Sequence, residues 1–167
     1  MRYKKLIAKS AIAYLLLLTS SAAMAAGCGD GVLENETFDG SLIVNDARSC
    51  SIISSTIEGN LIVRDTDNVL LLNNVVGGRI RVLRTDGREG FGVANVIANT
   101  VFTGNLAVTQ YGTANVIENE TLSGNIRVNG NIEALAQKNI SAGNLTCANN
   151  TSLRSFLNFA IGTLNCE

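Results

Sequence analysis

The sequence predicts an all-β protein, a single parallel β-helix of six to seven turns, here called rungs, with a period of 19 to 20 residues. The prediction depends on a glycine that is followed two residues later by Leu or Ile and four residues later by Val or Cys. This glycine recurs seven times, as Gly40, Gly59, Gly78, Gly104, Gly124, Gly143 and Gly162. A rung of this length cannot bury an apolar face by itself, whereas rungs stacked in parallel about 4.8 Å apart can. We expect a right-handed coil, although the period is also compatible with a left-handed one.

Side chains alternate between the two faces of a strand, so the pattern around each glycine predicts an inner and an outer face. Positions two before, two after and four after the glycine are expected to face the core. The position two before the glycine holds Phe38, Ile57, Val76, Phe102, Leu122, Ser141 and Ala160. The positions one and three after it are mostly Asn, Arg, Ser and Thr, which predicts a wet face. We expect the glycine to let the backbone bend at a corner or to permit a close approach inside the coil.

A polar residue also recurs five positions before the glycine, as Asn35, Ser54, Asn73, Asn99 and Asn119. Two interpretations stay open. Asparagines stacked at one corner can form a hydrogen-bonded ladder between rungs. Asparagine also tolerates the left-handed backbone conformation that tight turns require.

The amino terminus has the features of a secretory signal peptide, which we assign to residues 1–25. Four basic residues precede the apolar residues 11–18, and Ala23-Met24-Ala25 supplies a small-x-small cleavage pattern. The apolar stretch is shorter than the roughly 20 residues of a spanning helix, so we expect no transmembrane segment after cleavage. Residues 26–167 then form the β-helix domain. Lipoprotein processing at Cys28 is a less favoured alternative, and the exported protein is expected in the periplasm, on the outer surface or outside the cell.

Cysteine spacing provides an independent check on the period. Cys147 and Cys166 occupy the same core position, one 19-residue period apart. Residues stacked in register have Cα atoms about 4.8 Å apart, within the range that a disulfide requires. We therefore pair Cys147 with Cys166 and, by elimination, Cys28 with Cys50. The bridges would staple the last and first rungs, where strand edges are exposed, and they indicate an oxidising compartment.

Composition excludes several functions. Without the leader the chain keeps nine basic and 14 acidic residues, a net charge of minus five, which argues against nucleic acid as a partner. The chain has no histidine, so it cannot build a Ser-His-Asp or Cys-His nucleophilic site or a His-containing zinc site. No pair of carboxylates is marked out for acid–base chemistry. We therefore expect no catalytic residues and no cofactor.

One step departs from the period, because Gly78 and Gly104 are 26 residues apart. We place about seven extra residues in a loop around residues 84–92. Loops that project from a rigid scaffold commonly carry binding, so this loop is the candidate binding site. Its candidate residues are Arg84, Asp86, Arg88, Glu89 and Phe91.

Charged residues are expected to stack at the same corner in two rows. One row holds Asp46, Asp65 and Arg84, and the other holds Arg48, Asp67 and Asp86. We interpret the rows as a ladder of surface ion pairs. A calcium site is a weaker alternative, because nearby arginines would offset the carboxylates; its oxygen ligands would come from Asp65, Asp67, Asp86 and Glu89.

The Gly-Asn-Leu/Ile-x-Val rhythm over residues 31–167 resembles that of short secreted parallel β-helix proteins of bacteria. The resemblance implies the coil but no single function, because such coils serve polysaccharide-cleaving enzymes, phage fibres, adhesins and ice-binding proteins. The outward Thr-x-Thr ladder expected for ice binding is absent. Residues 110–115 resemble a curlin repeat, which occurs once.

Two main functional hypotheses follow. The first is a non-enzymatic module, secreted or located in the periplasm or on the cell surface, that is structural or adhesin-like and binds a protein or a glycan. The second is a subunit that assembles end to end into fibres, as curlin-like proteins do. A polysaccharide-active enzyme is a more distant third.

Overall fold

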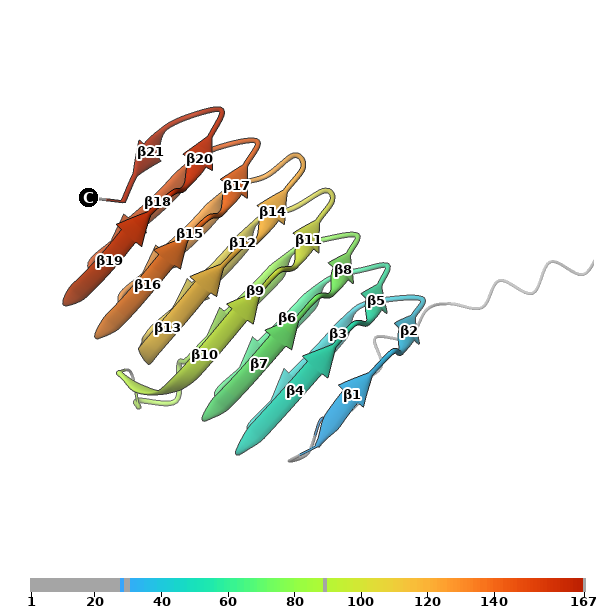
Figure 1. Cartoon of the computed structure of the whole chain (residues 1–167). Coiled ribbons are helices and arrows are strands. Elements are labelled where there is room, and N and C mark those ends of the chain that lie inside the picture. Colours follow the sequence, from blue (N-terminus) through green and yellow to red (C-terminus); the bar gives the residue numbers. More distant parts are fainter. Residues whose placement is uncertain (1–27, 29–30, 89, 167) are drawn as a thin grey trace, which may run out of the picture.

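The structure is a computed structural model that describes Cys28 and residues 31–88 and 90–166. These residues form an all-β coil with 21 strands in three parallel sheets, and each rung contributes one strand to each sheet (Figure 1). The prediction of a parallel β-helix of about seven rungs is confirmed. The predicted signal peptide and Glu89 lie outside the described residues.

The first sheet contains the longest strands of the coil. They are β1 (Val32–Glu34), β4 (Ser49–Ile53), β7 (Asn68–Leu72), β10 (Phe91–Ile97), β13 (Tyr111–Ile117), β16 (Glu133–Gln137) and β19 (Ser152–Phe156). The second sheet is narrow, because its strands have two residues each. They are β2 (Thr37–Phe38), β5 (Thr56–Ile57), β8 (Val75–Val76), β11 (Thr100–Val101), β14 (Glu120–Thr121), β17 (Ile140–Ser141) and β20 (Phe159–Ala160).

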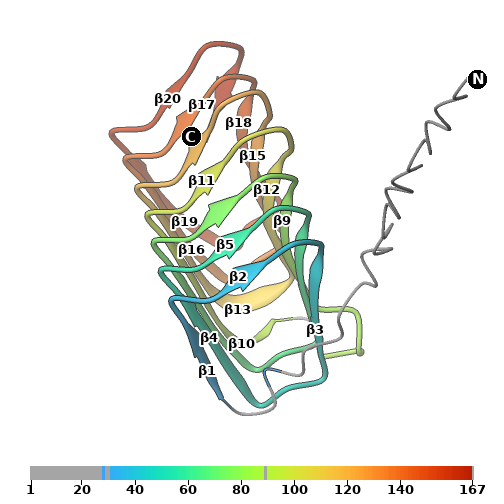
Figure 2. The same ribbon diagram turned by 90° about the vertical axis from the view of Figure 1, so that its right-hand side faces the viewer.

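The third sheet carries the residues that follow each repeated glycine. Its strands are β3 (Leu42–Asn45), β6 (Leu61–Arg64), β9 (Ile80–Leu83), β12 (Leu106–Thr109), β15 (Ile126–Asn129), β18 (Leu145–Ala148) and β21 (Leu164–Asn165). Figure 2 views the coil from its amino-terminal end, where β1, β2 and β3 follow one another clockwise while the chain moves away from the viewer. The coil is therefore right-handed.

The core is a set of straight rows in which apolar side chains stack from rung to rung. The row two residues after the glycine pairs Leu42 with Leu61, Leu61 with Ile80, and so on through Leu145. These six side chains are fully buried. Full burial of a Leu or Ile contributes about 1.5–3 kcal/mol, so the rows are the main source of stability. They confirm the predicted inner face of the third sheet.

The repeated glycines lie at the corner between the second and third sheets, here called the second corner. The backbone N–H of Gly59 donates to Gly40 O, and that of Gly78 donates to Gly59 O, at 3.0 and 2.8 Å. A Cβ atom at Gly78 would lie 2.8 Å from Gly59 O, closer than side chains come to backbone. The glycine is therefore needed for a close approach between rungs.

The prediction that Phe102 and Leu122 face the core is wrong. Both side chains are 45% exposed, and the inward positions of β11 and β14 are taken by Val101 and Thr121. In rungs four and five, one additional residue lies between the inward position of the second sheet and the start of the third sheet. The inward residue is therefore three positions before the glycine in these rungs, and not two. The extra residue turns both side chains outward.

The asparagine ladder is real, but it takes different residues from those predicted in several rungs. It runs along the corner between the first and second sheets, the first corner, through Ser55, Asn74, Asn99, Asn119, Asn139 and Asn158. At each step a backbone N–H donates to the Oδ1 atom of the next rung, at 2.9–3.1 Å. Asn35 and Asn73 instead have positive φ angles of 57° and 56° and form the bend itself. Both sequence interpretations therefore apply, each to different asparagines.

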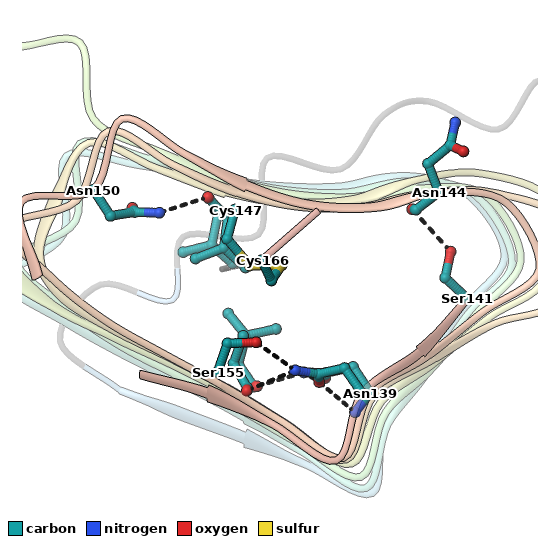
Figure 3. Close-up of a disulfide and its surroundings, with 12 residues drawn as sticks. Asn139, Ser141, Asn144, Cys147, Asn150, Ser155 and Cys166 are labelled. Atoms are coloured by element: carbon teal, nitrogen blue, oxygen red, sulfur yellow. Dashed lines mark hydrogen bonds between the residues drawn. A yellow bond between two sulfur atoms is a disulfide. The ribbon is translucent and has the colours of Figure 1, made fainter. Parts of the chain in front are cut away.

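Both predicted disulfides are present. Cys28 is bonded to Cys50 and Cys147 to Cys166, with Cα atoms 5.4 and 4.6 Å apart. Figure 3 shows Cys147 and Cys166 inside the coil, while Asn139 and Asn150 point inward from two corners. The disulfides are typical of an oxidising, non-cytoplasmic environment. No described residue belongs to a helix long and apolar enough to cross a membrane.

Candidate functional site

The predicted loop projects from the third corner, where the third sheet leads into the first sheet of the next rung. Arg64 of β6 and Asn68 of β7 are aligned with Leu83 of β9 and Val93 of β10. Three residues separate the first two and nine separate the second two, so the loop contains six extra residues. The seventh extra residue of the long repeat lies at the second corner of rung four. The prediction of an insertion within residues 84–92 is thus confirmed for six of the seven residues.

Arg84, a predicted binding residue, is buried at the base of the loop. Its side chain has no exposed surface, and its Nη1 and Nη2 atoms each lie 2.9 Å from a carboxylate oxygen, of Asp67 and Asp86 respectively. The Nε atom makes a longer bond of 3.4 Å to Asp86. Arg88 lies 3.8 Å from both carboxylates and is largely exposed. Arg84 therefore fastens the loop to the previous rung and has no surface left for a ligand.

The electrostatics of this cluster favour its charged form. Burial opposes the charge on Arg84, but hydrogen bonds and attraction from Asp86 and Asp67 outweigh it and raise the pKa of Arg84. The hydrogen bonds from Arg84, assisted by the Arg88 N–H, lower the pKa of Asp86 below its ordinary value of 3.8. Charge-assisted pairs of this kind are stronger than neutral hydrogen bonds.

We expect Asp86→Asn to destabilise the protein in a pH-dependent manner. A carboxylate whose pKa is lowered by folding stabilises the protein above its unfolded-state pKa and loses that effect as the pH falls. The difference in unfolding free energy between wild type and Asp86→Asn should therefore be constant near neutral pH and shrink as the pH falls below 3.8. Urea titrations from pH 7 to pH 3 measure it, and a difference that grows on acidification would contradict the prediction.

Phe91, another predicted binding residue, lies at the surface next to a buried tyrosine. Phe91 is 67% exposed and begins β10, where it is aligned with Tyr111 of the next rung. Tyr111 is fully buried, its ring centroid is 5.9 Å from the Arg84 guanidinium carbon, and its hydroxyl has no hydrogen-bond partner among the described residues. Burial raises the pKa of Tyr111 well above the ordinary value. The cluster is therefore a structural plug at the third corner, between Asp67, in the turn from rung two to rung three, and Tyr111 of rung five.

The weak calcium candidates have other partners. Asp65 accepts a hydrogen bond from the Thr85 hydroxyl, and Asp67 and Asp86 bind Arg84. Within the described residues no group of three or more potential ligands is placed to hold a metal ion. Glu89 is outside the described residues.

A second site, which the sequence reading did not single out, lies on the outer face of the third sheet. It is a hollow of about 450 Å³, and its lining includes Arg79, Arg81, Asn105, Ala107, Asn125 and Arg127. We call it the arginine groove. Arg81 is aligned with Ala107 of the next rung, and Ala107 is aligned with Arg127 of the rung after that. The two arginines are therefore two rungs apart, with a small residue between them. By the rung spacing, their Cα atoms are roughly 10 Å apart.

The three arginines of the groove have no carboxylate to balance them. Arg79, Arg81 and Arg127 are exposed, and none belongs to an ion pair among the described residues. No acidic residue occurs in the third-sheet strands. In a chain with 14 acidic residues this separation of charge is a local feature that favours anions.

Asparagines next to the arginines form a second, outer ladder. Asn125 donates from its backbone N–H and its Nδ2 atom to Asn105 Oδ1, at 2.8 and 2.9 Å, and the Asn144 N–H donates to Asn125 Oδ1 at 2.7 Å. Figure 3 shows Asn144 pointing away from the coil. The ladder fixes the amides along the groove. The signal was available in the sequence, because the outward positions beside the glycine carry arginine and asparagine but no acid.

Comparisons of the chain with protein-family models, with curated proteins and with solved structures gave no match.

Proposed function

We propose that the protein is an exported, non-enzymatic binding module that holds an acidic glycan chain along the arginine groove. The observation that carries the proposal is the alignment of Arg81 and Arg127 beside a ladder of fixed asparagines. Neither arginine has an ion-pair partner in the part of the chain that the structure describes. Guanidinium groups bind carboxylates and sulfates through two parallel hydrogen bonds. Amides and the hydroxyl of Thr109 suit the sugar hydroxyls between those charges.

The chemistry of the groove supports binding rather than cleavage. Glycosidases typically place two carboxyl groups on either side of the scissile bond. The described lining of the groove contains arginine, asparagine, threonine, alanine and isoleucine but no carboxylate. The two disulfides and the leader-like residues 1–25 support export, with the final location in the periplasm, on the cell surface or in the medium.

Alginate, a carboxylated polysaccharide, is a suitable probe, with neutral dextran for comparison. Isothermal titration of the oxidised protein should show binding to alginate but not to dextran, and the affinity should fall as salt screens the charges. The double variant Arg81→Gln/Arg127→Gln should bind alginate at least about tenfold more weakly, the effect of losing roughly 1.4 kcal/mol of charge-assisted hydrogen bonding.

The matched control is Arg154→Gln, which removes one exposed arginine from β19 in a different sheet. Its alginate affinity should remain close to that of the wild type. The control removes one charge and the double variant two, so an equal loss of binding free energy per removed charge would show that only net charge matters and would overturn the proposal. So would equal binding of dextran and alginate, or a steady release of reducing ends from alginate during incubation.

A further inference from the structure

The two ends of the coil differ sharply in how well they are covered. Leu42 of rung one and Leu164 of rung seven occupy the same row of the third sheet, yet Leu42 is fully buried and Leu164 is 49% exposed. Cys28 is 2% exposed and belongs to the same buried cluster as Leu42. On the side of the third sheet, the amino-terminal end of the core is therefore closed and the carboxy-terminal end is open.

The open end also concentrates large apolar side chains at the surface. In rung seven these are Phe156, Leu157, Phe159, Ile161 and Leu164, which we call the end patch; Leu157 and Ile161 are 73% and 74% exposed. Arg154 is the single charged residue among residues 150–166. Figure 1 places the rung-seven strands β19, β20 and β21 at the carboxy-terminal end of the stack. Large apolar side chains that gather at the surface of one rung mark a candidate interaction site.

The carboxy-terminal end also has strand edges without a hydrogen-bonded neighbour in the part of the chain that the structure describes. Among the described strands β19 pairs with β16 alone, β20 with β17 alone and β21 with β18 alone. Each therefore has an unpaired edge. Edges of β-sheets are normally protected from pairing by charged residues or by cover. Rung one has the three acidic residues Glu34, Glu36 and Asp39 beside its edges, whereas the described residues of the carboxy-terminal edges carry one charge, that of Arg154.

We propose that the end patch is the interface of a tail-to-tail homodimer, in which the carboxy-terminal ends of two copies meet across a two-fold axis. The same end of a second copy offers the same apolar side chains, three free strand edges and, among the described residues, Arg154 as its one charge. The amino-terminal end is a poorer partner, because its core is closed and its edges are acidic. A two-fold interface also closes on itself, which limits assembly to two chains.

The test uses the oxidised chain without its leader, by sedimentation equilibrium and light scattering. The wild type should have twice the monomer mass and dissociate on dilution. The double variant Leu157→Asn/Ile161→Lys should be monomeric. Leu157 has a positive φ of 57°, a conformation that asparagine tolerates better than leucine, so the variant is expected to fold. Circular dichroism and the melting temperature of the disulfide-bonded state would confirm that it does.

Leu122→Lys is the matched control, since Leu122 is an exposed apolar residue on the side of rung five. This variant should remain dimeric. Hydrogen exchange provides a second measurement, because amides along the free edges of β19 and β20 should exchange more slowly in the dimer than in the monomeric variant. A wild type that is monomeric at every concentration would overturn the proposal. Open-ended fibres, or a double variant that still dimerises, would overturn it as well.

Discussion

Gly124→Ala is expected to destabilise the protein by at least about 3 kcal/mol, because the added methyl group has no room. An ideal Cβ at Gly124 would overlap the backbone oxygen of Gly104 in the previous rung and lie 2.5 Å from its carbonyl carbon. Both obstacles are backbone atoms, so no side chain can rotate away to relieve the contact. The two rungs would have to separate locally, which breaks stacking on both sides of the second corner.

Gly87→Ala is the control for this prediction. Gly87 is in the exposed loop, has a φ of 77°, and a Cβ there would meet no atom within 4 Å. Its substitution costs only the strain of a left-handed alanine, about 1–2 kcal/mol. Guanidinium unfolding of the oxidised proteins, followed by circular dichroism, compares the two. Equal losses for both variants would mean that glycine is needed for conformation, and that the close approach between rungs is unimportant.

The glycines also explain why the architecture was predictable from the sequence. The close contact between the backbones of neighbouring rungs recurs along the coil. It requires glycine at the same position of each repeat, so the sequence contains glycine at a regular spacing. The Cys147–Cys166 disulfide follows from that register directly, since the two residues are one period apart. Features that every rung requires for the same physical reason appear in the sequence as a repeat, and a repeat can be recognised without the structure.

The candidate site was less predictable, for two reasons. The seven extra residues between Gly78 and Gly104 are divided between the third corner, which leads into rung four, and the second corner of rung four. One residue is enough to turn Phe102 outward. The sequence predicts Arg84 as a binding residue of the loop, because nothing local shows that its side chain turns back between Asp67 and Asp86. The importance of Arg81 and Arg127 depends on their having no ion-pair partner among the described residues, which is a property of the whole surface rather than of a motif.

Asn119→Ala is expected to cost about 3 kcal/mol, because it breaks the ladder at its most buried step. Asn119 Oδ1 accepts hydrogen bonds from the backbone N–H and the Nδ2 atom of Asn99, both at 3.0 Å. Its Nδ2 atom donates to Val96 O at 2.7 Å and to Ile117 O at 3.0 Å. Alanine would leave the buried backbone N–H of Asn99 without an acceptor and would remove the donor to Val96 O, and each such buried group costs roughly 1–3 kcal/mol. The Nδ2 atom of Asn99 would keep Leu71 O and Ile97 O as acceptors.

Two further variants separate burial from the hydrogen bond itself. Asn125→Ala removes a step of the outer ladder, where water can replace the lost partner, and should cost less than about 1 kcal/mol. Asn119→Ser should fall between the two alanine variants, because Ser55 already occupies this row and accepts from the Glu36 N–H at 3.2 Å while donating to Ile53 O at 2.9 Å. Urea unfolding curves rank the three variants. If Asn125→Ala lowered the free energy of unfolding as much as Asn119→Ala, burial of the ladder would not contribute to its effect on stability, and the prediction would be wrong.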